Sequence, residues 1–316
     1  MSNKMKKTAL DRKLDKIRAA EESGKLGTKL TNRTLRKLTS NKLAVIGVLL
    51  FLVVCILCFG APLFTKHDPM MFDLRAKMAA PSAEHILGTD NEGYDIFVRL
   101  MYGGRISLTV SFIAVFLITI LGVILGGVAG YFGGWVDNVI MRLCDVLMCL
   151  PGVPILLIIS TILDASDIDA KYRIYLLMIY LTFISWTGTA RLVRGQILSL
   201  REQEYMVAAE AMGYSTSRKI FKHLIPNVMP QLIVQMSLSL GSMILYEATL
   251  SYLNLGVKAP YAAWGSMINI ISTNQDILQN HLNVWVPAGV CIVIAVLGFN
   301  FVGDGLRDAL DPKARR

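Results

Sequence analysis

Long runs of apolar residues, separated by shorter polar segments, dominate the chain from residue 43 onward. A helix that crosses a membrane needs about 20 mostly apolar residues. Six stretches meet or approach that length, and they cover residues 43–64, 107–131, 138–163, 173–195, 227–250 and 284–303. The pattern predicts an all-α integral membrane protein with about six transmembrane helices.

Composition and charge add an orientation to this picture. Of the 316 residues, 54% are hydrophobic, and the 32 Lys and Arg outnumber the 23 Asp and Glu. Residues 1–42 hold 13 of the Lys and Arg but 4 of the acids, so the remainder of the chain carries 19 of each. A basic segment beside a hydrophobic helix is typical of cytoplasmic retention. We therefore expect both ends in the cytoplasm, and no nucleic-acid partner, because the surplus is not spread over a soluble face.

These patterns divide the chain into five parts. They are a cytoplasmic basic segment (1–42), a first transmembrane helix (43–64), an extracytoplasmic loop (65–106), a core with five further helices (107–310) and a cytoplasmic tail (311–316). The core contains a cytoplasmic loop, 199–226, and a second long outer segment, 251–283. Both outer segments are expected to be structured and available to an outside partner.

The cytoplasmic loop predicts two short helices joined by a turn. Ser199 and Glu202 fit a capping box, so a helix is expected from about Leu200. Gly213 suits the left-handed position that ends a helix. Ser215 can cap a second helix over 216–224, which Pro226 is expected to stop.

The same loop carries a resemblance to a known family. The run Val207-Ala208-Ala209, then Gly213 and Ile225-Pro226, resembles the EAA loop of ABC importer permeases, although Val207 stands where the general pattern has Glu. With Tyr205 before it, the run is similar to the oligopeptide, dipeptide and nickel branch, and to its second-type ("C") permease.

Motifs outside the loop extend the resemblance over roughly residues 30–312. They are His85–Asp95, Arg99–Leu108, Met141-Arg142 with Asp145 and Pro151, Glu247–Gly256, Trp264–Met267 and Gly303–Pro312. Several separated motifs in one order are specific. The resemblance implies the type I ABC importer permease architecture in a bacterial plasma (inner) membrane.

What the resemblance implies is a complex. A second permease subunit completes the pathway, two cytoplasmic ATPase subunits dock on the loop, and an extracytoplasmic solute-binding protein delivers a short peptide. The sequence lacks a G-x-x-x-x-G-K-[ST] phosphate loop, so ATP and Mg²⁺ are expected on partner subunits, with no cofactor and no catalytic residue in this chain. The ATPase-coupling residues are expected to be Tyr205, Val207, Ala208, Ala209, Glu210, Gly213, Arg218 and Pro226.

Three ionisable residues fall within or near predicted spans, where unpaired charge is costly. Arg142 and Asp145 lie three apart and can pair as a structural clasp, or contact the solute. Glu247 has no local partner, so it either faces a polar path or packs against the neighbouring permease. The four His do not cluster in sequence, and no metal site is expected.

Glycine and proline positions predict local features of the helices. Gly122 and Gly126 have the small-xxx-small spacing of closely packed helices. Pro151 and Pro154 are expected to bend the third span, either to shape a cavity or to relieve packing.

Two other functions compete with a peptide permease. A nickel or other small-solute importer of the same branch shares these motifs. A self-sufficient secondary transporter would use Arg142, Asp145 and Glu247 as a relay, but it would leave the docking loop without a purpose. A membrane enzyme is disfavoured, because neither HExxH nor GxSxG occurs.

Overall fold

A computed structural model describes residues 36–65, 67–166 and 170–310 of the chain. The predicted basic segment up to residue 35 and the tail 311–316 lie outside the described residues. The helices are α3 (Lys42–Phe59), α4 (Ala61–Phe64), α5 (Ile96–Phe132), α6 (Gly134–Cys149), α7 (Gly152–Ala165), α8 (Ala170–Arg201), α9 (Glu204–Ala211), α10 (Thr216–Arg218), the π-helical turn η1 (Lys219–Leu224), α11 (Ile225–Tyr252), α12 (Trp264–Thr273), α13 (Gln275–Asn280) and α14 (Leu282–Leu310).

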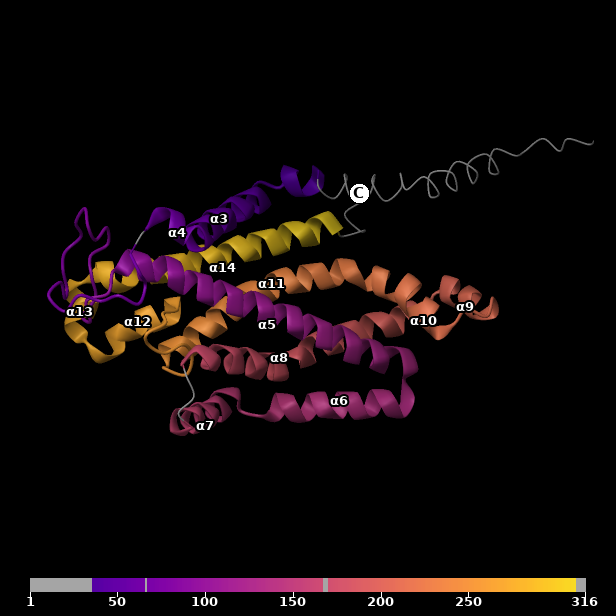
Figure 1. Ribbon diagram of the computed structural model, residues 1–316. Coiled ribbons are helices and arrows are strands. Elements are labelled where there is room, and N and C mark those ends of the chain that lie inside the picture. The colour runs from indigo at the N-terminus through magenta and orange to yellow at the C-terminus, as the bar shows by residue number, and fades with distance from the viewer. Residues whose placement is uncertain (1–35, 66, 167–169, 311–316) are drawn as a thin grey trace, which may run out of the picture.

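The long helices run roughly side by side in an elongated bundle (Figure 1). α14 packs against both α3 and α11, while α5 packs most extensively against α8. The short helices α12 and α13 and the loop 65–95 lie at one end of the bundle, here called the α12 end. α9, α10 and η1 lie at the other, the α9 end.

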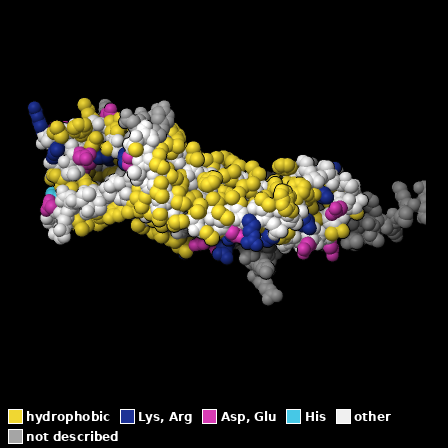
Figure 2. Space-filling model, turned by 90° about the horizontal axis from the view of Figure 1, so that it is seen from below, with side chains coloured by type: hydrophobic (Ala, Val, Ile, Leu, Met, Phe, Trp, Pro, Cys, Tyr) yellow, Lys and Arg dark blue, Asp and Glu magenta, His cyan; other side chains and the backbone are white. Residues whose placement is uncertain are grey.

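A hydrophobic band surrounds the middle of the bundle, as expected of a membrane protein. Figure 2 shows this band between two ends where most of the charged side chains gather. Large apolar side chains on the outer faces are exposed, such as Leu49 at 57% and Ile158 at 61%. The hydrocarbon core of a membrane would cover such apolar side chains.

Four helices are long and apolar enough to cross a membrane: α3, α5, the continuous Thr216–Tyr252 unit that includes α11, and α14. The bent pair α6 and α7 makes a fifth candidate if it is one span. The stretch predicted at 173–195 lies within α8, which is long enough at 32 residues but carries more polar side chains and is not among these candidates. The all-α membrane fold is confirmed, whereas six spans with both ends inside remain a prediction.

Glycines bring α5 and α8 into direct backbone contact. A Cβ atom at Gly122 would lie 2.6 Å from Cβ of Thr189, and one at Gly130 would lie 2.9 Å from the carbonyl oxygen of Arg194. Neither distance is compatible with a real side chain. The close packing predicted for Gly122 and Gly126 is therefore present, and its partner is α8.

The break predicted in the third span is also present. α6 ends at Cys149, α7 begins after Pro151, and their axes differ by 77°. Proline lacks the backbone N–H that would continue the helix. The bend brings the start of α7 close to α8 and α11, because the Tyr180 hydroxyl donates to the Gly152 carbonyl and a Cβ at Gly152 would lie 3.4 Å from the Tyr246 hydroxyl.

The outer loop expected at 65–106 is shorter than predicted. α5 begins at Ile96, eleven residues before the apolar run, because the Asp95 carboxylate caps it by accepting from the Val98 amide at 3.0 Å. The count of apolar residues missed this first part of α5, since it contains polar residues such as Arg99 and Arg105. The loop itself is held by turns and two isolated bridges, Phe72 with Tyr94 and Thr89 with Asp95.

Candidate functional site

The first helix of the predicted coupling loop begins later than expected. α8 continues through Ser199 to Arg201, and α9 starts at Glu204 after Gln203, which makes no side-chain cap. The capping box assigned to Ser199 and Glu202 is therefore wrong, because Ser199 is inside a helix that tertiary packing extends past the apolar run.

The turn after α9 agrees with the sequence. Gly213 has φ +69°, a conformation in which glycine has no steric cost. Ser215 caps the next helix, and its Oγ accepts from the Arg218 amide at 3.4 Å. The Arg218 guanidinium lies 4.1 Å from the centre of the Tyr214 ring, which stacks on His223. The turn is thus held by its own side chains.

The second predicted helix does not stop at Pro226. One α-turn, α10, leads into the π-turn η1, and η1 continues directly into α11, where Pro226 occupies the first turn. Ile225, the residue before it, donates its amide to the Ile220 carbonyl, so helical hydrogen bonding runs up to the proline at the switch from the π-turn to the α-helix. The predicted break is therefore wrong, and the element is joined to α11 without a loop.

Two buried side chains attach this element to the bundle. Met206 and Leu224 are 3% and 0% exposed and pack with Val193, Ile197 and Val228. Ala209 is also buried, at 1%. Of the other predicted coupling residues, Tyr205, Val207, Ala208, Glu210, Gly213, Arg218 and Pro226 are all exposed.

The exposed face of this element is unusually apolar for a polar end of the molecule. Val207, Met212 and Phe221 are 61%, 62% and 69% exposed. Exposed apolar side chains at a polar end are typical of a protein interaction surface. Met212 and Phe221 were not singled out from sequence, although both are large apolar residues among polar neighbours. Partial burial also raises the pKa of Tyr205 above its ordinary value.

A cavity of about 280 Å³ lies between α5, α8 and α11 in the middle of the bundle. Its lining residues are Ile118, Ser185, Gly188, Thr189, Gln235, Ser239, Ser242, Met243 and Tyr246. Gln235 donates to Ser239 along α11 at 3.3 Å. Six of the nine lining residues carry a hydroxyl or amide group, and no Asp, Glu, Lys, Arg or His is among them.

None of these polar cavity residues was identified from the sequence alone. The signal was the spacing of Gln235, Ser239, Ser242 and Tyr246, which places four polar groups on one face of a helix in an otherwise apolar run. The bend at Pro151 borders the same region through Tyr246, so the bend contributes to the cavity's surroundings.

The charged residues on α6 pair mainly with α8. Asp145 Oδ1 lies 2.5 Å from Arg191 Nη2, whereas Arg142 approaches Asp145 only to 3.8 Å and is 85% exposed. Asp137 receives two hydrogen bonds from Arg194, at 3.0 and 2.5 Å. The nearest partner of Asp145 is thus on another helix, a contact that spacing along one helix does not reveal.

Glu247 lies inside the chain and on neither of the surfaces expected for it. It is 0% exposed, and its Oε1 accepts from Ser251 at 2.7 Å. Ser251 Oγ in turn is 3.5 Å from the Val257 amide. Among the described residues no Lys or Arg forms an ion pair with Glu247. The carboxyl therefore connects the end of α11 to the segment that follows it.

Comparison with known proteins places these features in a family. Residues 118–316 match the model of the binding-protein-dependent transport system inner membrane component, and residues 29–81 match the N-terminal TM domain of oligopeptide transport permease C. The chain is 38% identical to the oligopeptide transport system permease protein OppC of Bacillus subtilis, over 94% of both chains. It is 38% identical to that organism's dipeptide transport system permease protein DppC, over 96% of this chain and 92% of the relative. Identity to OppC of Haemophilus influenzae is 35%, over 93% and 92%.

Proposed function

We propose, because this chain belongs to the inner membrane components of binding-protein-dependent transport systems, that it forms half of the pathway of an ATP-driven importer for short peptides. The relatives that match nearly its whole length are permease proteins of oligopeptide and dipeptide transport systems. The chain itself is a multi-pass inner membrane transporter component and not an enzyme.

The single observation that best supports a peptide solute is the neutral lining of the 280 Å³ cavity. A peptide backbone offers amide donors and acceptors at every residue, and hydroxyl and amide side chains satisfy both kinds of group. Because the lining lacks a fixed charge, side chains of either sign can pass without forming a strong ion pair. The open face of this cavity would be completed by the second permease subunit.

The cavity gives less support to a nickel importer. Nickel binds best to imidazole and thiolate groups. Within the part of the chain that the structure describes, no group of three or more His, Cys, Asp or Glu is placed to hold a metal ion. Peptide is therefore the favoured solute, and nickel is the alternative to be tested beside it.

For coupling, we propose that the loop assigned to 199–226 transmits force through residues 204–224. ATP and Mg²⁺ would act on two cytoplasmic ATPase subunits, which dock on the exposed apolar face around Val207, Met212 and Phe221. Since η1 runs directly into α11, a push on this element is delivered to the helix that carries Gln235, Ser239 and Ser242. A shift of packed helices between two arrangements is a known form of switching.

Transport by the purified complex tests this function. The tagged chain is isolated in mild detergent, its companions are identified, and the complex is placed in liposomes with its binding protein and ATP. We expect a second permease, Walker-type ATPases and ATP-dependent uptake of a labelled tripeptide, with no uptake of nickel. Recovery of the chain alone, active without ATP, would instead establish a secondary transporter.

A further inference from the structure

A second cavity, larger than the one between α5, α8 and α11, lies at the α12 end. It measures about 610 Å³ and is formed by the segment before α5, the loop after α11, and α12. Small-molecule sites have volumes of about 300–1,000 Å³. Neither the coupling element nor the central cavity accounts for this pocket, and its residues are polar and apolar in similar measure.

One wall of this outer pocket is a turn built around a buried carboxylate. Asp90 is 7% exposed and accepts from the amides of Glu92 and Tyr94, both at 2.9 Å. It also receives a hydrogen bond from Arg99 Nη1 at 2.9 Å. Asp90 is therefore neutralised and occupied, while the turn that it organises presents the Glu92 carboxylate, which forms no ion pair among the described residues.

Arg99 is held in place in this wall, with one buried hydrogen-bond donor unpaired among the described residues. Its guanidinium lies 4.1 Å from the centre of the Tyr94 ring, which fixes the plane of the group. Its Nε is buried and has no hydrogen-bond partner in the described part of the chain. Arg99 is therefore held rigidly between Asp90 and Tyr94 and gives this wall a fixed shape.

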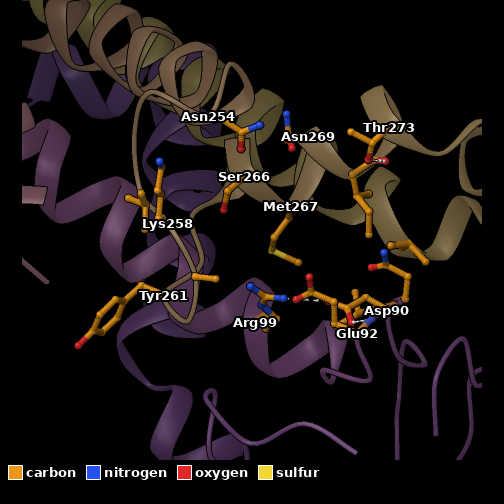
Figure 3. Close-up of a pocket in the computed structure, with 16 residues that line it drawn as sticks. Asp90, Glu92, Arg99, Asn254, Lys258, Tyr261, Ser266, Met267, Asn269 and Thr273 are labelled. Atoms are coloured by element: carbon orange, nitrogen blue, oxygen red, sulfur yellow. Dashed lines mark hydrogen bonds and ion pairs between the residues drawn. The ribbon is translucent and has the colours of Figure 1, made fainter. Parts of the chain in front are cut away.

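The opposite side of the pocket carries the complementary charge. Figure 3 shows Lys258 on one side and Glu92 on the other, with Met267 between them and Asn254 and Asn269 across the cavity from Arg99. The Lys258 ammonium lies 2.6 Å from Asp164 but remains 38% exposed. Separated opposite charges with neutral amides between them match a zwitterion that has a polar backbone.

We propose that this pocket is a receiving site for a short peptide with free termini, distinct from the central cavity. Glu92 binds the terminal ammonium, Lys258 attracts the terminal carboxylate, and Met267 with Ile270 contacts apolar side chains. The inference rests on the proposed peptide-importing function. It assigns recognition of charged ends to the outer pocket and tolerance of any side chain to the neutral cavity.

Binding of alanine peptides to the membrane complex in nanodiscs, without its binding protein, tests the site. The probes are tri-alanine to penta-alanine, each compared with its N-acetylated form by calorimetry. We expect acetylation to weaken binding about tenfold, as befits one charge-assisted hydrogen bond. Glu92→Gln should weaken the free peptide similarly and remove the difference between free and acetylated probes. Glu84→Gln, on the same outer segment but outside the pocket lining, is the matched control and should behave as wild type.

A second pair of measurements tests recognition of the carboxylate end of the peptide. Lys258→Gln should remove the preference for a free carboxylate over a C-terminal amide while leaving the amine preference intact. The proposal is overturned if no alanine peptide binds, if the Glu92→Gln complex still discriminates acetylated probes, or if Glu84→Gln weakens binding as much as Glu92→Gln does. An uptake assay distinguishes failure of the receiving site from failure of the proposed function. If the wild-type complex imports peptide but binds no alanine peptide in this assay, the proposed function stands and the receiving site is rejected.

Discussion

Along α5 and α8, glycine and small residues bring two backbones into contact, whereas the face of α11 that borders the cavity carries hydroxyl and amide side chains beside open space. The first seam is also fixed to α6 by the two hydrogen bonds between Asp137 and Arg194. α11, by contrast, is continuous at one end with a π-turn and with the exposed element 204–224, for which we propose the coupling role. Tight packing resists sliding, and a cavity leaves room for it. The comparison indicates a frame of α5, α6 and α8 and a lever, α11.

The largest effect on stability is expected at the close contact between α5 and α8. A Cβ at Gly126 would overlap the Ala190 carbonyl oxygen and lie 2.9 Å from the carbonyl carbon, so Gly126→Ala should separate α5 from α8 and destabilise the complex by about 1–3 kcal/mol. Gly127→Ala is the matched control, because its Cβ would meet only Ile197 Cδ1 at an ordinary 3.7 Å. Thermal unfolding in detergent measures both. Equal melting temperatures for the two variants would contradict a rigid frame.

A smaller, more selective effect is expected at the joint of the lever. Nothing lies within 4 Å of a Cβ placed on Gly213, so Gly213→Val acts only through the backbone, where φ of +69° costs a β-branched residue about 1–2 kcal/mol. We expect normal assembly and continued ATP hydrolysis, with uptake per ATP reduced roughly tenfold if the strain shifts the element away from its coupled position.

Gly213→Asn is the control for that experiment, since asparagine accepts the left-handed conformation more readily. Reconstituted complexes give uptake and hydrolysis side by side. Full uptake with Gly213→Val would remove the coupling role from this turn, and loss of ATP hydrolysis together with uptake would indicate failed docking in place of uncoupling.

The sequence predicted the features of the frame (α5, α6 and α8) better than those of the lever (α11 and the element before it), and the reason is physical. Gly122, Gly126 and Pro151 act through local rules, namely the absence of a side chain or of an N–H, and those rules hold in any surroundings. The errors at Ser199 and Pro226 arose because packing extends α8 and joins η1 to α11, which local signals do not determine. The Asp145–Arg191 pair and the 610 Å³ pocket depend on segments far apart in sequence, so no spacing along the chain could place them.

The smallest effect is expected from Glu247→Gln at the fixed end of the lever, a substitution that separates a structural role of Glu247 from a role in the pathway. Gln keeps an oxygen that accepts from Ser251 and has nearly the same shape, so Glu247→Gln should change unfolding stability by less than about 1 kcal/mol and leave uptake intact. Glu247→Leu removes the acceptor, leaves the proton of the buried Ser251 hydroxyl without this partner and should cost about 1–3 kcal/mol. Uptake profiles for acidic, neutral and basic tripeptides decide between the roles. If Glu247→Gln changes that profile while the melting temperature stays constant, the negative charge acts on the solute, and the outer end of α11 belongs to the pathway. If the profile is unchanged, the role of Glu247 is to hold the segment after α11 in place.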